Sequence, residues 1–134
     1  MSDSSGVSTH AYDPLGRIVS YTAPQSGVNL TCTYDQVGNR LHLGETGGAP
    51  GVTYVYDPVG NLVQITNTNS EITSYTYDPL RREVQKYTPA YGVLTAHAFD
   101  AGGRETSRLV KTGSAVTAAY TATYDSVGNR LTVG

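Results

Sequence analysis

Aspartate, histidine and cysteine are among the side chains of this 134-residue chain that could bind a metal or take part in catalysis. Six of the seven aspartates directly follow an aromatic residue, at Tyr12-Asp13, Tyr34-Asp35, Tyr56-Asp57, Tyr77-Asp78, Phe99-Asp100 and Tyr124-Asp125. A row of carboxylates could bind Ca²⁺, but a compact calcium loop takes several ligands from about a dozen residues. Successive aspartates here are 21 to 25 residues apart. The spacing therefore favours a structural role for each Asp, and we expect no metal and no other cofactor.

The histidines and the single cysteine do not form a recognisable catalytic group. His10 and His97 stand two residues before an aromatic–Asp pair and are interpreted as strand residues. Cys32 holds the same position, which suits a buried small apolar residue, whereas His42 is expected on the opposite face. A Cys–His pair needs hydrogen-bond reach, and the sequence has no serine-hydrolase, P-loop or zinc-protease motif. We therefore predict no catalytic residue and do not expect an enzyme.

The aromatic–Asp pair marks an internal repeat, whose steps are 22, 22, 21, 22 and 25 residues. A glycine follows four residues after the aromatic in five of the six copies, at Gly16, Gly38, Gly60, Gly103 and Gly128. Asp at the first position of a type I turn accepts backbone hydrogen bonds, and a proline at the second position presets φ. Glycine then adopts the left-handed conformation that a bulged hairpin needs. Each copy of this tip motif is therefore predicted to form the tip of a β-hairpin.

The fourth copy departs from the pattern, because Arg81 stands at the glycine position. A left-handed arginine would cost roughly 1–2 kcal/mol. We therefore expect this hairpin to use a different turn.

The segments beside the tips alternate as strands should. Leu30, Cys32 and Tyr34 share one face before the second tip. After it, Leu41 and Leu43 are expected on one face, with Arg40 and His42 on the other. The segment 104–110 in the fifth copy alternates poorly. Variation in repeat length is expected in the connections opposite the tips, at 22–27, 44–51, 67–71, 88–92 and 111–115.

The composition supports a thin, tyrosine-rich sheet. Leu, Ile, Val and Phe make up about a fifth of the chain, close to the level at which globular folding becomes doubtful. Eleven tyrosines, with one Phe and no Trp, favour strands over helices. A net charge of −2 without a basic block makes nucleic acid an unexpected partner. We also expect no membrane span, no signal peptide and no intrachain disulfide.

The tyrosines at the repeat position allow two interpretations. They are expected to stack between neighbouring hairpins, beside Tyr54 and Tyr75, as an aromatic ladder that stabilises the sheet. The alternative is a platform for glycans, because rings with polar ends suit contacts with sugars. The six aspartates are expected to lie in a row along the hairpin tips.

The repeat resembles the Rhs/YD-repeat family. The matching motifs are Tyr-Asp-Pro-Leu-Gly-Arg at 12–17, Tyr-Asp-Gln-Val-Gly-Asn-Arg-Leu at 34–41, Tyr-Asp-Pro-Val-Gly-Asn-Leu-Val at 56–63 and Tyr-Asp-Ser-Val-Gly-Asn-Arg-Leu at 124–131. The resemblance implies an all-β fold of tandem antiparallel hairpins in a curved, spiral-like sheet. It covers one array of six repeats over residues 8–133, after a short flexible N-terminus at 1–7.

The family implies a structural role in a secreted or cell-surface protein, such as a polymorphic toxin, a Tc toxin C component or a teneurin. In the toxins the shell encloses an effector, and its end plug carries an autoproteolytic aspartyl site. No segment here resembles that plug or an effector tail. Twelve strands closed into a ring would be roughly 18 Å wide, too narrow for a 100-residue cargo about 34 Å across. The expected partners are therefore further YD repeats of a larger chain, or other copies joined through sheet edges, with glycans as the alternative.

Overall fold

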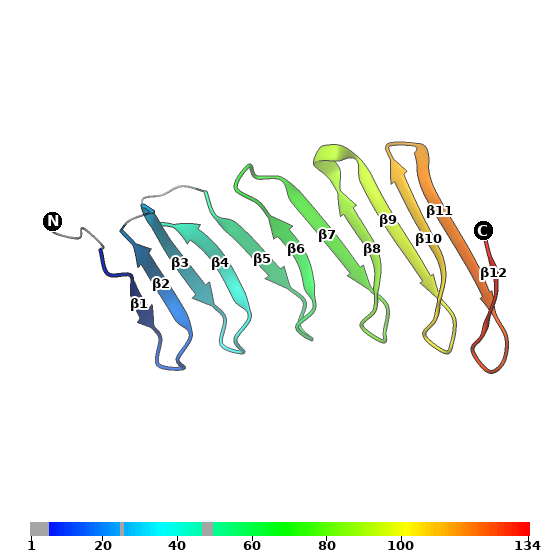
Figure 1. Cartoon of the computed structure of the whole chain (residues 1–134), viewed down its shortest axis with the longest axis horizontal. Helices are drawn as coiled ribbons and strands as arrows, with labels where there is room; N and C mark the ends of the chain where they lie inside the picture. Colours follow the sequence, from blue (N-terminus) through cyan, green and yellow to red (C-terminus); the bar gives the residue numbers. More distant parts are fainter. Residues whose placement is uncertain (1–5, 25, 47–49) are drawn as a thin grey trace, which may run out of the picture.

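The structure is a computed structural model that describes residues 6–24, 26–46 and 50–134. Within these residues, twelve strands form one antiparallel sheet, in which each strand pairs with its neighbours in the sequence (Figure 1). The strands are β1 (Thr9–Tyr12), β2 (Ile18–Ala23), β3 (Val28–Tyr34), β4 (Arg40–Glu45), β5 (Val52–Tyr56), β6 (Leu62–Thr66), β7 (Ile72–Tyr77), β8 (Glu83–Thr88), β9 (Val93–Phe99), β10 (Glu105–Thr112), β11 (Ala115–Tyr124) and β12 (Arg130–Val133). A 3₁₀ turn, η1 (Pro89–Tyr91), precedes β9. The predicted all-β class and antiparallel hairpin architecture are confirmed.

Every hairpin tip contains the same β-bulge. The aromatic residue pairs with the sixth residue after it, and the residue before the aromatic pairs with the eighth, so the seventh has no partner. The unpaired residues are Val19, Leu41, Val63, Val84, Thr106 and Leu131. A bulge bends its strand and increases the local twist. One bulge per repeat therefore gives the sheet a regular source of curvature.

Because of the bulge, the faces predicted for Arg40 and Leu43 are wrong relative to each other. Arg40 pairs with Tyr34, and Leu43 pairs with Cys32. Arg40 and Leu43 therefore share a face, whereas strict alternation placed them on opposite faces. The extra residue at Leu41 changes the phase of the return strand. His42 pairs with Thr33 and lies on the face opposite Cys32, as predicted.

The fifth hairpin shows why alternation failed there. Its return strand, β10, has eight residues, with a bulge at each end of its pairing. The first bulged residue is Thr106, where other copies have Val or Leu. The second bulge lies on β11 at Thr117, between the pairs Val110↔Ala118 and Lys111↔Val116. Only the first bulge changes the phase of β10, and the second changes the phase of β11.

The location predicted for variation in repeat length is wrong for the longest repeat. That repeat has the longest strand, β11 with ten residues, and the shortest connection, Gly113 and Ser114. Gly113 has φ 59°, the left-handed value for which a two-residue hairpin turn favours glycine. The additional residues therefore extend the strands, because the connection is already a minimal turn.

Successive repeats are staggered by two residues. Gln64, for example, pairs with Val55 of its own hairpin and with Ser74 of the next one. Two residues correspond to roughly 6.6 Å along a strand, and two strands to about 9.6 Å across the sheet. Neighbouring tips are therefore about 12 Å apart, and the strands slant across the sheet (Figure 1).

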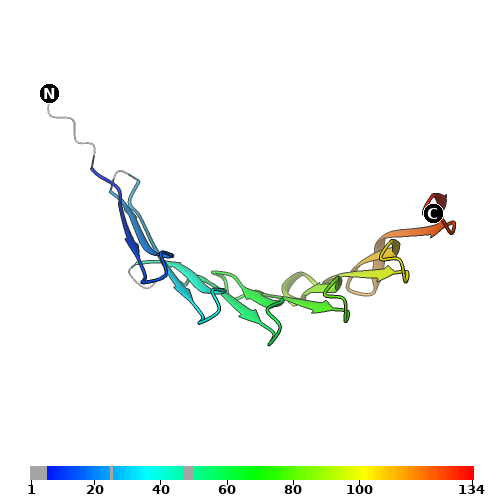
Figure 2. The ribbon, with the colours of Figure 1, turned by 90° about the horizontal axis from the view of Figure 1, so that it is seen from below.

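The sheet is a single curved layer, which forms an open arc when it is seen from below with its long axis across the view (Figure 2). Among the described residues, Ala122 is the only buried hydrophobic side chain, at 3% exposure. Most other strand residues are half-buried or exposed. Strand pairing and contacts between repeats, rather than a central core, therefore hold the array together. Most of the predicted flexible N-terminus, residues 1–5, lies outside the described residues.

Candidate functional site

The hairpin tips form the edge of the sheet where the tip motifs gather. In the first tip, Asp13 Oδ1 accepts backbone N–H bonds from Leu15 at 2.9 Å and Arg17 at 3.0 Å. The Gly16 N–H donates to the Asp13 carbonyl at 2.9 Å. The other tips repeat this backbone bond, and their aspartate Oδ1 atoms accept backbone N–H bonds in the same manner. Each carboxylate therefore closes its own turn.

These hydrogen bonds favour the ionised aspartates. The backbone N–H of Arg17 is the largest influence on Asp13 and helps to hold its pKa below the ordinary value. For Asp57, partial desolvation is the largest influence and raises the pKa, but hydrogen bonds from the backbone and side chain of Asn61 outweigh it. The pKa of Asp125 is lowered first by the side chain of Asn129. Charged acceptors of several N–H groups behave in this way.

The second carboxylate oxygen is taken by the residue that follows the glycine position. Arg17 Nε donates to Asp13 Oδ2 at 2.6 Å, and Asn39 Nδ2 donates to Asp35 Oδ2 at 2.9 Å. This position holds only Arg or Asn, at Arg17, Asn39, Asn61, Arg82, Arg104 and Asn129. Both side chains donate a hydrogen bond to the carboxylate, and arginine also neutralises its charge. Only arginine has further N–H groups that reach the next tip.

Those additional arginine N–H groups connect one tip to the next. Arg17 Nη1 donates to the Asp35 carbonyl at 3.1 Å, and its guanidinium lies 4.6 Å from the centre of the Tyr34 ring. Arg104 makes the same two contacts with the sixth tip, and Arg82 makes them with the fifth. Sequence reasoning noted this position but did not assign its role. The signal was the restriction of the position to Arg and Asn.

Arg81 keeps the left-handed turn, so the prediction of a different turn is wrong. Its φ is 63°, and its N–H donates to the Asp78 carbonyl at 2.9 Å, as in the other tips. Its side chain reaches the preceding tip, where Nε donates to Asn61 Oδ1 at 2.8 Å and Nη2 to the Val59 carbonyl at 2.7 Å. These bonds offset the strain. They also connect the fourth tip to the third, where Asn61 stands at the position from which an arginine bridges other tips.

The repeat tyrosines contact the previous repeat through their hydroxyl groups. Tyr77 Oη donates to the Leu62 carbonyl at 2.8 Å, and Tyr34, Tyr56 and Tyr124 make the equivalent bond to Ile18, Arg40 and Glu105. The acceptor is always the sixth residue after the previous aromatic. Phe99 lacks the hydroxyl. We call this bond the tyrosine latch.

The predicted ring stacking between hairpins is therefore not the main contact. In the described part of the chain, ring pairs join His10 to Tyr12 and Tyr21, and His97 to Phe99. None joins the aromatic residues of two successive tips. The stagger explains this result, because rings about 12 Å apart lie beyond the 4.5–7 Å of an aromatic pair.

A second type of turn, which the sequence analysis missed, copies the tip on the opposite edge. Asn67 replaces the aspartate, and its Oδ1 accepts N–H bonds from Asn69 and Glu71 at 2.9 Å. Ser70 takes the glycine position with φ 62°. The Tyr91 hydroxyl donates to the Glu71 carboxylate at 2.9 Å and ties the 3₁₀ turn to this loop.

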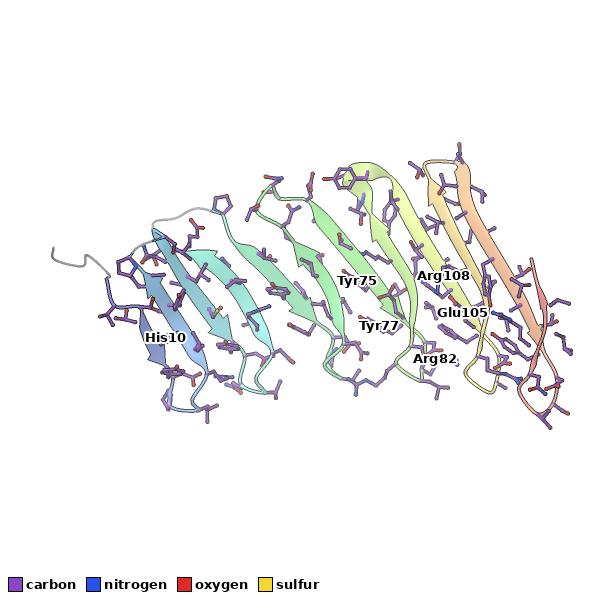
Figure 3. All side chains as sticks on the ribbon, viewed as in Figure 1. His10, Tyr75, Tyr77, Arg82, Glu105 and Arg108 are labelled. Atoms are coloured by element: carbon purple, nitrogen blue, oxygen red, sulfur yellow. The ribbon has the colours of Figure 1, made fainter. Side chains whose placement is uncertain are left out.

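One cluster of charged side chains lies on the face of the sheet that carries Phe99 and the other repeat aromatics, here called the aromatic face. His97 Nδ1 is 2.6 Å from Glu105 Oε1, and Arg108 donates to both oxygens of the Glu105 carboxylate at 2.9–3.0 Å. Figure 3 shows Glu105 and Arg108 on β10. Partial burial acts to raise the pKa of Glu105, but the hydrogen bonds from His97 and Arg108 outweigh it. The pKa of Glu105 therefore lies below its ordinary value. The carboxylate is fully occupied, which suits a connection between β9 and β10.

A hollow of about 550 Å³ opens on the same face near the N-terminal end. His10, Tyr21, Cys32, Tyr34 and Arg40 are among the residues that line it. Cys32 is only half-buried, so its predicted burial is wrong in extent, because the single layer has no opposing sheet. His42 lies on the other face.

No group of three or more His, Cys, Asp or Glu side chains suited to a metal occurs among the described residues. The tip aspartates instead lie in a row at intervals of about 12 Å. No helix of the described chain is long and apolar enough to span a membrane.

Residues 56–94, which include the third and fourth tips, match the family model described as RHS Repeat. This segment carries the RHS repeat. The resemblance inferred from the tip motifs is thus confirmed. No curated protein matches the chain significantly.

Solved structures with the same fold come from Tc toxins. The chain matches the crystal structure titled TcdB2-TccC3-Cdc42 with a TM-score of 0.75 at 20% identity, and that of TcdB2-TccC3 with 0.73 at 19%. It matches the Photorhabdus luminescens Tc holotoxin pore, with a substituted TccC3, at 0.71 and 19%. Each match covers 94% of this chain and 7% of the other. The chain shares their fold and spans a small part of their length.

Proposed function

We propose that this RHS-repeat chain is a non-catalytic structural segment of a larger β-shell. The observation that carries the proposal is that polar side chains of the tip motif are hydrogen-bonded within the turns and between the repeats. The aspartates, Tyr34, Tyr56, Tyr77 and Tyr124, and the arginines after the glycine position spend their hydrogen-bonding groups on closing turns or joining repeats. No group of three or more His, Cys, Asp or Glu side chains suited to a metal is left over among the described residues. The seventeen motif residues named above are thus proposed to be structural.

The open shape of the sheet supports the proposal that the chain is one part of a shell rather than a complete shell. A single layer with one buried hydrophobic side chain leaves both faces accessible in the described residues. The chain aligns with about one-fourteenth of the matched Tc toxin chains. An arc that small cannot surround a folded cargo. We propose that it contributes one stretch of a shell that encloses a toxin, in a protein that is secreted or displayed at the cell envelope.

Circular dichroism combined with limited proteolysis tests the structural part of this proposal. We expect a β-sheet spectrum and cleavage confined to the connections opposite the tips. A mainly helical or unfolded spectrum would contradict it. A hydrolase screen tests the non-catalytic part, which fails if an activity is found that one tip Asp→Asn substitution removes.

A glycan-binding module is the second candidate, favoured by the hollow that contains the rings of His10, Tyr21 and Tyr34 beside Arg40. Rings with polar groups at their rim can contact sugars through both features. Glycan-array binding that Tyr21→Ala abolishes without loss of β-structure would support this function. An array without hits would exclude it.

A further inference from the structure

All five junctions between repeats use one register. Numbered from the aromatic residue, position +8 of one repeat pairs with position −3 of the next. The pairs are Ser20↔Thr31, His42↔Thr53, Gln64↔Ser74, Gln85↔Ala96 and Ser107↔Thr121. The pair is Ser–Thr at two junctions and His–Thr, Gln–Ser and Gln–Ala at the others, so the register comes from the repeat geometry and not from one side-chain pair.

The two outer edges of the sheet carry the same two positions without a partner. Position +8 of the last repeat is Thr132, which in the described residues pairs only with Thr123. Position −3 of the first repeat is Thr9, which pairs only with Thr22. All residues of β1 and β12 are exposed. The outer edge of β12 is therefore complementary in register to the outer edge of β1.

Side chains at these edges repeat an existing junction. The second and sixth repeats share Asn-Arg-Leu after the glycine. At the junction of the second and third repeats, the Tyr56 hydroxyl donates to the Arg40 carbonyl at 3.2 Å, and the Arg40 guanidinium lies 5.0 Å from the centre of the Tyr54 ring. Arg130 is the equivalent of Arg40.

The partners of Arg130 would come from the first repeat. Tyr12 is the equivalent of Tyr56, and His10 is the equivalent of Tyr54. Tyr12 is 58% exposed, and in the described residues it is the one repeat tyrosine whose hydroxyl has no carbonyl acceptor. His10 lies on β1 at the N-terminal edge (Figure 3). The first repeat thus presents the donor, and the last repeat presents the free carbonyl.

Two of the features that usually prevent edge pairing, proline and lysine, are absent from both edge strands. Native edges are often protected by proline, lysine or inward-pointing charges. β1 reads Thr-His-Ala-Tyr and β12 reads Arg-Leu-Thr-Val, without proline or lysine. The bulge of the first hairpin lies on β2 at Val19, away from Thr9, whereas that of the sixth lies on β12 at Leu131, next to Thr132, just as a bulge precedes position +8 at every internal junction.

We propose that copies of this chain associate head to tail, with β12 of one copy paired antiparallel to β1 of the next and Thr132 opposite Thr9. The Tyr12 hydroxyl of one copy then donates to the Arg130 carbonyl of the other. This inference rests on the proposed scaffold function and names a second copy as the partner. Because the two edges differ, the contact does not close on itself as a symmetric dimer would, and it continues the arc.

Disulfide trapping tests the register. In a Cys32→Ala background, chains with Thr9→Cys are mixed with chains with Thr132→Cys and oxidised. Cα atoms of directly opposed residues lie about 4.5–5.5 Å apart, within the roughly 4.4–6.8 Å that a disulfide spans. We expect a mixed covalent dimer, identified by mass spectrometry, and little dimer from either variant alone.

Val133→Cys mixed with Thr9→Cys is the matched control. Val133 is exposed and adjacent to Thr132 but lies on the other face, so it should yield little dimer. Equal yields from the two mixtures would overturn the register. Tyr12→Phe should weaken the association about two- to tenfold. Tyr87→Phe, a change at an exposed tyrosine in the middle of the sheet, should leave it unchanged.

Light scattering and circular dichroism over a concentration series separate this inference from the scaffold proposal. A β-structured chain that stays monomeric overturns the head-to-tail association and leaves the scaffold standing. A chain that gains β-structure and mass together supports the association. A chain unfolded at every concentration contradicts both.

Discussion

At the residue scale, two features recur at the tips: the hydrogen bond of the tyrosine latch and the left-handed backbone conformation of the glycine. The latch joins a side chain to a backbone carbonyl of the preceding repeat, so it tolerates any amino acid at the acceptor. The glycine position tolerates an arginine once, where that side chain gains two hydrogen bonds in the preceding tip. Both features can be tested by single substitutions.

The latch predicts opposite effects for two complementary substitutions. Tyr77→Phe removes the hydrogen bond to the Leu62 carbonyl and should lower the free energy of unfolding by about 0.5–1.5 kcal/mol. Phe99→Tyr should raise it by a similar amount, because its hydroxyl would reach the Glu83 carbonyl, the equivalent acceptor. Urea unfolding followed by tyrosine fluorescence measures both. Two changes of the same sign would contradict the latch.

The glycine position predicts a purely conformational cost. Gly60 has φ 86°, and a Cβ added there would meet only an Arg81 guanidinium nitrogen at 3.8 Å, an ordinary contact. Gly60→Ala should therefore destabilise the array by about 1–2 kcal/mol through backbone strain alone. Thermal unfolding measures the change, with Val59→Ala as an exposed control in the same tip. A loss no larger than that of the control would argue against the strained turn.

At the scale of the elements, the junctions between hairpins are not equally strong. β4 and β5 pair through His42↔Thr53 and Leu43↔Val52, fewer pairs than at any other junction in the described residues. Asn39 follows the glycine there and lacks the reach of Arg17 or Arg104. The sheet is expected to open first at this junction.

Installing the missing arginine should strengthen that junction. In Asn39→Arg, Nε can still satisfy Asp35, while the guanidinium stacks on the Tyr56 ring and donates to the Asp57 carbonyl. We expect roughly 0.5–1 kcal/mol of stabilisation and slower amide hydrogen exchange at Thr53. Arg17→Asn is the reciprocal control and should speed exchange at Thr31. Unchanged exchange in both variants would show that the arginine bridges contribute nothing to the junctions.

At the scale of the whole molecule, six ionised aspartates close the tips together. The pKa of each tip aspartate lies below its ordinary value in the folded chain. A lowered folded pKa contributes stability that is complete above the unfolded value, near 3.9, and is lost as the pH falls through the folded value. The array should therefore be stable to acid down to about pH 4 and lose stability below it.

Melting temperatures measured from pH 7 to pH 2 test this behaviour. Asp57→Asn should make the third tip insensitive to acid, because an amide oxygen can accept the same N–H bonds, as Asn67 does. Its stability should fall less steeply below pH 4 than that of the unchanged chain. A melting temperature that is constant across the whole range would contradict the role of the carboxylates.

The sequence by itself determined the repeat, the hairpin tips and the all-β class. Turn formation is local, so Asp at the start and Gly at the end of four residues are enough to identify a tip such as 13–16. Alternation then identified the strands beside it. The RHS resemblance depended on the same local motifs, and for that reason it could also be recognised from the sequence.

The tertiary structure decided what joins one repeat to the next. The latch of Tyr77 to Leu62 spans 15 residues, and the reach of Arg17 to Asp35 spans 18. These contacts depend on the two-residue stagger, which is set by the bulge that corrected the face of Arg40. A bulge adds one residue without a distinctive side chain, so it leaves little trace in the sequence. The separation of the rings follows from that stagger, and only the pairing of all twelve strands reveals it.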